Sequence, residues 1–97
     1  MYAQVVEVQL QPGKADQMGE TFKSAVLPLI REREGFKNAY VLVDRDANRG
    51  IAIALYDTKE QVDALLSSGF FEEQVAKFEG VFASQPKREV YEIAANA

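Results

Sequence analysis

The segment Ile51–Tyr56, with the sequence IAIALY, limits most strongly how this chain can fold. Its composition indicates a β-strand, and successive side chains of a strand point to opposite faces of the sheet. Both faces of this strand are therefore apolar. The segment Ala39–Val43 has the same character. Because soluble monomers rarely leave a large apolar patch in water, we expect both faces of the sheet to be covered.

The remaining periodicities predict the element order β-α-β-β-α-β. Strand patterns occupy four segments: Tyr2–Leu10, Phe36–Asp44, Gly50–Asp57 and Lys87–Ala94. Helical spacing covers residues 14–32 and resumes after Thr58, where Gln61 completes a capping-box pattern. This order is that of the α+β, ferredoxin-like split βαβ fold, with both helices on one face of an antiparallel sheet. We expect a single domain over residues 1–97, with residues 94–97 as a frayed tail.

Both helical segments contain an interruption. Pro28 lies inside the first and removes one helical hydrogen bond, so we expect a bend or an early end there. Ser67–Gly69 divides the second segment into two pieces, and Gly80 ends it. The predicted buried stripe of the first helix consists of Met18, Phe22, Ala25, Val26, Leu29 and Ile30.

The composition of the 97 residues excludes several kinds of site. The chain has no Cys and no His, so it has no thiol nucleophile, imidazole base or His-ligated haem or zinc. Its formal net charge of −4 argues against nucleic-acid binding. We therefore expect no metal and no cofactor. No segment has the length of a membrane span, and the start lacks the pattern of a signal peptide, so a cytoplasmic location is expected.

The apolar sheet also predicts self-association. Two copies that cover the helix-free face of each other's sheet would each gain on the order of 10 kcal/mol from several hundred Å² of apolar burial, before association costs. We therefore expect a homodimer through this face. The alternative is that Ala52 and Ala54 are tolerated on a mostly polar outer surface.

Several short motifs, in their order and spacing, resemble antibiotic biosynthesis monooxygenase-like (ABM) domains. Leu55–Glu60 is similar to the family's apolar–Trp–x–Ser–x–Glu turn, with Tyr56 in place of Trp. The family's helix end and Pro-Gly-Phe entry to the second strand resemble Leu27–Leu29 and Glu34–Phe36. Its second-helix break and last strand resemble Ser68–Phe71 and Val90–Glu92. The resemblance extends over about residues 2 to 93.

This resemblance implies a dimeric α+β barrel with a ligand pocket between helices and sheet in each subunit. Some family members oxygenate phenolic polyketides with O₂ and neither metal nor flavin. Others degrade haem or act on small signalling or quinone-like molecules, and many have no assigned activity. The haem-degrading members carry Asn, Trp and His where this chain has Val6, Leu65 and Val75, so we do not expect haem chemistry.

Oxygenation without a cofactor needs polar groups that orient the substrate and an apolar wall around it. The candidate catalytic residues are Asn38, Tyr40 and Tyr56, although amphipathic sheet positions explain the two tyrosines more simply and strand entry explains Asn38. The candidate ligand-binding residues, which could also be simple core, are Val6, Phe22, Leu65, Phe71, Val75 and Phe78.

Two functions therefore remain open. The first is a cofactor-independent, monooxygenase-like enzyme that acts on a small aromatic or quinone-like molecule. The second is a non-catalytic dimeric module that binds a small apolar ligand or only assembles. A cavity that contains Asn38 or a tyrosine hydroxyl would favour the enzyme, and a filled helix–sheet interface would favour the module.

Overall fold

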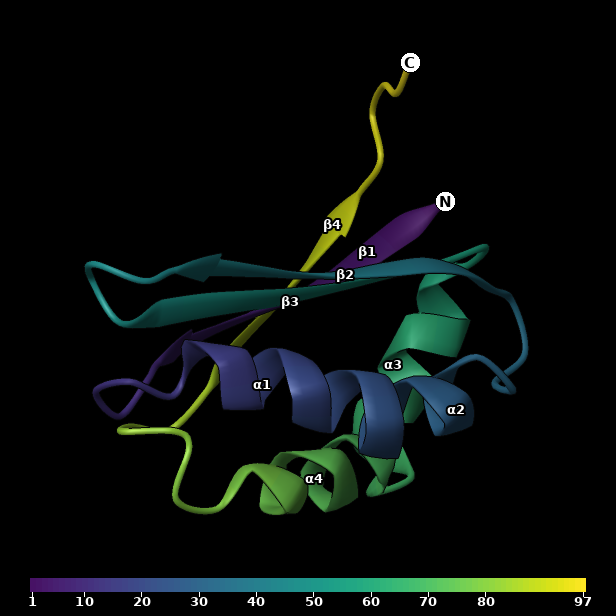
Figure 1. Cartoon of the computed structure of the whole chain (residues 1–97). Coiled ribbons are helices and arrows are strands. Elements are labelled where there is room, and N and C mark those ends of the chain that lie inside the picture. The colour runs from purple at the N-terminus through teal and green to yellow at the C-terminus, as the bar shows by residue number, and fades with distance from the viewer.

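In the computed structural model, which describes residues 1–97, all helices pack on one side of a four-stranded antiparallel sheet (Figure 1). The strand order is β2-β3-β1-β4, which confirms the predicted ferredoxin-like topology. The strands are β1 (Tyr2–Gln9), β2 (Phe36–Asp44), β3 (Arg49–Tyr56) and β4 (Lys87–Glu92). The helices are α1 (Ala15–Thr21), the π-helical η1 (Phe22–Val26), α2 (Leu27–Ile30), α3 (Lys59–Ser67), α4 (Phe70–Val75) and the 3₁₀ turn η2 (Ala76–Phe78).

The pairing of β1 with β3 fixes which side chains face the helices. Val6 lies opposite Ala52, and Gln4 lies opposite Ala54. Val6, Gln4 and Ala54 are all buried under the helical layer. The alternative in which Ala52 and Ala54 belong to the outer surface is therefore wrong. Small side chains suit the helix-covered face because they let the helices and their aromatic rings approach the middle of the sheet.

The larger apolar residues of β3 lie on the opposite, helix-free face. This outer face carries Ile51, Ile53 and Leu55 in the middle of the sheet, with Tyr40 and Leu42 beside them on β2. Tyr40 and Leu42 are about half exposed, at 49% and 48%. The strand is therefore apolar on both faces, as its sequence predicts, and the chain's own helices cover only one of them.

The first helical segment widens into a π-helix before Pro28. The backbone N–H of Leu27 donates to the carbonyl of Phe22, five residues earlier, and Pro28 follows in the first turn of α2. A π turn inserts one residue into the helical repeat, and it places Pro28 where its missing N–H costs little. The predicted bend is thus a local widening of the helix.

The widened turn also corrects the predicted buried stripe. Leu29 is 43% exposed, whereas Leu27 packs against the core. The extra residue in the π turn rotates everything after it, so a stripe drawn with regular helical spacing selects the wrong leucine.

The start of α3 and the break before α4 follow the sequence prediction. The Thr58 hydroxyl accepts from the Gln61 backbone N–H at 3.2 Å, and the Thr58 N–H donates to the Gln61 side-chain oxygen at 3.1 Å. These two hydrogen bonds form the predicted capping box. Gly69 has a φ of 83°, a conformation that favours glycine, and it separates α3 from α4.

The last strand, β4, ends at Glu92, two residues before the predicted end at Ala94. The Ile93 N–H still donates to the carbonyl of Met1 at 2.8 Å, so the pairing with β1 continues for one more bond. None of the helices has both the length and the apolar character needed to cross a membrane.

We predict that Gly35→Ala lowers the free energy of unfolding by about 2–3 kcal/mol. Gly35 has a φ of 82°, and a Cβ at this position would overlap the Gln61 carboxamide of the capping box. Gly13→Ala is the matched control, because Gly13 has a φ of 76° with open space around it. It should cost only about 1 kcal/mol. Denaturant unfolding measures both, and equal losses would contradict the role of the capping box.

A candidate ligand cavity between the helices and the sheet

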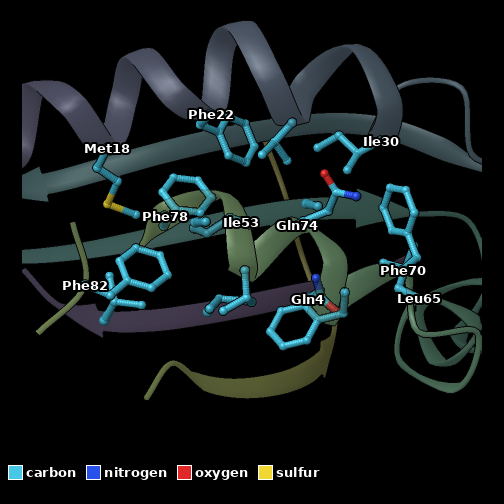
Figure 2. Close-up of a pocket in the computed structure, with 17 residues that line it drawn as sticks. Gln4, Met18, Phe22, Ile30, Ile53, Leu65, Phe70, Gln74, Phe78 and Phe82 are labelled. Atoms are coloured by element: carbon cyan, nitrogen blue, oxygen red, sulfur yellow. The ribbon is translucent and has the colours of Figure 1, made fainter. Parts of the chain in front are cut away.

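A cavity lies between the helical layer and the inner face of the sheet (Figure 2). It is lined by 17 residues, 15 of them apolar, from β1, β3, the first helical segment and the α3–α4 region. Its free volume is about 70 Å³, and it is open to solvent on one side. Concave, mostly apolar sites with a few polar groups are typical of small-molecule binding.

The structure brings the predicted ligand-binding residues together. All six of them line this cavity: Val6, Phe22, Leu65, Phe71, Val75 and Phe78. That they bind a ligand stays a prediction, but their side chains share one space.

Local sequence features explain why a space exists here. Ala52 and Ala54 present only methyl groups to the helices from the middle of the sheet. The break at Gly69 lets α4 turn so that its phenylalanines reach the same space. Phe78 and Phe82 stack with ring centroids 4.7 Å apart and form part of the wall.

Two glutamines, Gln4 and Gln74, supply the polar side chains of the lining. They are only 8% and 6% exposed. Neither was among the residues predicted from the sequence. Their positions in the sequence could have identified them. Gln4 lies on the same strand face as Val6, Val8 and Leu10, and Gln74 occupies a position at which its helix is otherwise apolar.

A cationic side chain holds the oxygen of each carboxamide. The Gln4 Oε1 accepts a hydrogen bond from Arg88 Nε, and Arg88 Nη2 donates to the carbonyl of Val62 at 3.0 Å. The Gln74 Oε1 accepts from Lys77 Nζ at 2.8 Å. Burial lowers the pKa of the Arg88 guanidinium, an effect that the nearby Asp63 carboxylate opposes. The ordinary value for arginine is so high that Arg88 stays charged at neutral pH.

Asn38 and Tyr40 lie on the outer face of the sheet, away from the cavity. They project beside Leu55 and Ile53, and the Asn38 Nδ2 donates to the Tyr40 hydroxyl at 2.8 Å. Both are exposed. Their predicted catalytic role remains a prediction, and neither residue is among those that line the cavity.

Tyr56 faces the helices but does not line the cavity. It is fully buried, and its ring packs edge-on against Phe36 with centroids 5.8 Å apart. Its hydroxyl has no hydrogen-bond partner. Burial raises the pKa of Tyr56 to about 12, against a smaller opposing effect of Arg33. Such a hydroxyl is a poor acid, and the catalytic role predicted for Tyr56 stays a prediction.

The arrangement suits an uncharged or delocalised organic molecule. No group of three or more acidic side chains lies together where it could hold a metal ion. The cavity offers apolar contact and two carboxamides, which can orient a ligand and stabilise charge on it but cannot remove a proton.

We predict that Tyr56→Phe raises the free energy of unfolding by about 1 kcal/mol at neutral pH, because it removes a buried hydroxyl without a partner. The sign of the pH dependence follows from the raised pKa. Unfolded tyrosine ionises near pH 10 and folded Tyr56 near 12, so stability is complete below pH 10 and falls as the pH rises towards 12. The difference between parent and variant in denaturant unfolding should therefore widen over this range. A stability difference that stays constant over this pH range would contradict the raised pKa of Tyr56.

Comparison with known structures shows the same fold in several proteins. One is a monooxygenase from the gene ActVA-Orf6 of Streptomyces coelicolor, solved with the ligand nanaomycin D. It has a TM-score of 0.80 and 16% identity, covering 99% of this chain and 89% of that chain. Another is SnoaB, a cofactor-independent oxygenase from Streptomyces nogalater. It has a TM-score of 0.76 and 14% identity, covering 98% and 94% of the two chains.

A third similar structure is NE2512, a protein of unknown function from Nitrosomonas europaea. Its TM-score is 0.77 at 20% identity, covering 99% of this chain and 91% of that chain. At these identities the likeness establishes the fold alone.

Among curated proteins, the uncharacterised protein Rv2557 of Mycobacterium tuberculosis is 36% identical over 56 residues. The match covers 58% of this chain and 25% of the relative, so it spans about a quarter of that protein's length. The model of the family "Antibiotic biosynthesis monooxygenase" matches residues 1–84, which is most of the chain. The chain therefore belongs to the antibiotic biosynthesis monooxygenase family.

Proposed function

We propose that this protein is a cofactor-independent, monooxygenase-like enzyme that acts on a small aromatic or quinone-like molecule in the helix–sheet cavity. The observation that carries the proposal is a largely apolar cavity with two buried carboxamides, in a chain of this family. Two proteins of the same fold support it, one a cofactor-independent oxygenase and the other a monooxygenase solved with nanaomycin D.

The proposed reaction needs little from the protein. A bound phenol or its keto tautomer loses a proton, and the resulting carbanion gives its electrons to O₂ as a carbon–oxygen bond forms. At a ring CH₂ group, the hydroperoxide that results loses water and leaves a carbonyl, so one oxygen atom enters the product and the other leaves as water. The cavity would hold the substrate, keep bulk water away and stabilise the anion, while the proton passes to solvent at the mouth.

The second candidate is a non-catalytic module that binds a small apolar ligand. One observation favours it: the lining contains neither Asn38 nor a tyrosine, the feature expected of the enzyme, and no lining side chain titrates near neutral pH. Under this alternative the cavity binds the same kind of molecule and leaves it unchanged.

The two functions differ in oxygen consumption. We expect O₂ uptake with at least one member of a panel of phenols, anthrones and hydroquinones, and one oxygen atom in the product by mass spectrometry with ¹⁸O₂. Val75→Phe enlarges a half-buried residue of the lining and should reduce this rate at least tenfold. Binding of panel members without any uptake would contradict the enzyme and favour the module.

Controls separate the cavity from the rest of the surface. Leu66→Phe adds a ring at an exposed position of α3 outside the lining and should leave the rate within about twofold. Asn38→Ala and Tyr40→Phe alter the outer face and should behave likewise. A large loss of O₂ uptake in either outer-face variant would indicate that the reaction takes place at the outer face.

We also propose that two copies pair through the outer face as a dimeric α+β barrel. The helix-free side of the sheet exposes large apolar residues, with Tyr91 at 51%, Tyr40 at 49% and Leu42 at 48%. Ile51 and Ile53 lie between them and are also incompletely buried. A contiguous apolar face of this kind is typical of an interface between copies.

Light scattering coupled to size-exclusion chromatography should report about twice the 10.8 kDa mass of one chain. Leu42→Asp puts a charge on the outer face and should give the monomer mass, since burying an unpaired charge is costly. The matched control is Leu66→Asp, at a leucine of similar exposure on α3, which should remain dimeric. A parent protein that is monomeric at micromolar concentration would contradict the dimer.

A further inference from the structure

The two buried glutamines of the cavity share one arrangement. Gln4 comes from β1 and Gln74 from α4, so they enter the space from the sheet and from the helical layer (Figure 2). Each places one end of its carboxamide on a cation, Arg88 for Gln4 and Lys77 for Gln74. Arg88 is further fixed by the Val62 carbonyl, and Lys77 by the Ala25 carbonyl at 2.9 Å.

These cations determine which way each carboxamide points. Arginine and lysine nitrogens only donate hydrogen bonds, so the atom that faces them must be the oxygen. The NH₂ group is therefore at the other end. In Figure 2 the Gln4 nitrogen lies on the side of its carboxamide towards the middle of the cavity, and its oxygen lies on the far side.

Neither NH₂ group has an acceptor within the protein. The hydrogen bonds of Gln74 and Gln4 to other side chains are those that their oxygens accept. Both residues are more than nine-tenths buried, and both border a cavity whose other lining residues are apolar. Tyr56 carries the one fully buried polar side-chain atom without a partner, so both glutamine nitrogens remain accessible. An occupant of the cavity that supplies an acceptor oxygen can therefore take the hydrogen bonds that water would otherwise accept.

We propose that Gln4 and Gln74 select the ligand by its acceptor oxygen. The site would take a molecule that presents a ketone, quinone or phenolate oxygen to these N–H groups, and would discriminate against one that presents only N–H or O–H donors. This inference rests on the proposed function only in requiring that the cavity binds a small molecule.

The cations strengthen this preference. A hydrogen bond from each oxygen to a positive charge polarises the carboxamide, so its N–H groups become better donors. The gain is largest for an oxygen that carries negative charge, in surroundings with few competing waters. Gln4 and Gln74 would then stabilise the enolate or phenolate of a substrate, and Arg88 and Lys77 would act as positioning residues.

Three bicyclic probes of nearly equal size test the selection. 1-Indanone presents a carbonyl oxygen, indole presents an N–H donor, and indene presents neither. Dissociation constants from NMR titration should show 1-indanone bound about tenfold more tightly than indene, the value of one good hydrogen bond. Indole should bind no better than indene. The side-chain ¹⁵N–¹H signals of Gln4 and Gln74 should shift with 1-indanone and much less with indene.

Gln4→Glu should reverse the preference. The carboxylate keeps its hydrogen bond to Arg88 but turns an acceptor oxygen, in place of the NH₂ group, towards the cavity. We expect the affinity for 1-indanone to fall about tenfold and indole to become the preferred probe. Gln17→Glu is the matched control, because Gln17 also accepts from a lysine, Lys14, but lies exposed on α1. It should leave the order of the probes unchanged.

The outcomes separate this inference from the proposed function. If indene, indole and 1-indanone bind equally in the parent, or Gln4→Glu leaves their order unchanged, the selection is overturned while the cavity remains a ligand site. If no probe binds, both the selection and the proposed use of the cavity are overturned. Reversal in Gln4→Glu together with an unchanged Gln17→Glu supports the selection.

Discussion

The fold depends on the need to cover a central strand that is apolar on both sides. Ala52 and Ala54 of β3 turn their methyl groups to the helices, while Ile51, Ile53 and Leu55 face the other way. The small side chains on the helix-covered face let the helices approach the sheet and leave the space of the cavity. No part of the chain covers the outer face, which carries the larger side chains. One strand thus determines both the cavity under the helices and the apolar face that the chain itself leaves uncovered.

The helical layer reaches this strand because its own regularity is broken twice. The π turn over η1 rotates the residues after Phe22, so that Leu27 packs inward and Leu29 does not. Gly69 redirects the chain between α3 and α4. The sequence predicted both interruptions, but local rules for Pro28 could not distinguish a kink from a widened turn. Whether the helix kinks or widens depends on which leucine packs against the sheet, and this packing is a property of the tertiary structure.

The candidate site was predictable where it is apolar and not where it is polar. All six predicted lining residues meet at the cavity, because helical and strand spacing identify the inward stripe whatever its use. Asn38 and Tyr40 were placed correctly on a common strand face, but a period of two does not say which face the helices cover. Gln4 and Gln74 were missed because the role of a polar residue within an apolar stripe depends on its hydrogen-bond partner, which local sequence does not reveal. Arg88 is 84 residues away from Gln4 in the chain.

The lack of a base in the lining does not by itself decide between catalysis and binding. A carboxamide cannot accept the substrate's proton, but a polarised N–H donor in an apolar space would lower the pKa of an oxygen acid that it binds. Water at the mouth could then take the proton, and the anion would remain held where O₂ is soluble and bulk water is scarce. A chain without histidine can therefore favour the reactive form of its ligand through geometry and charge alone. In the proposed reaction the protein would stabilise the anion, and the electrons would come from the substrate.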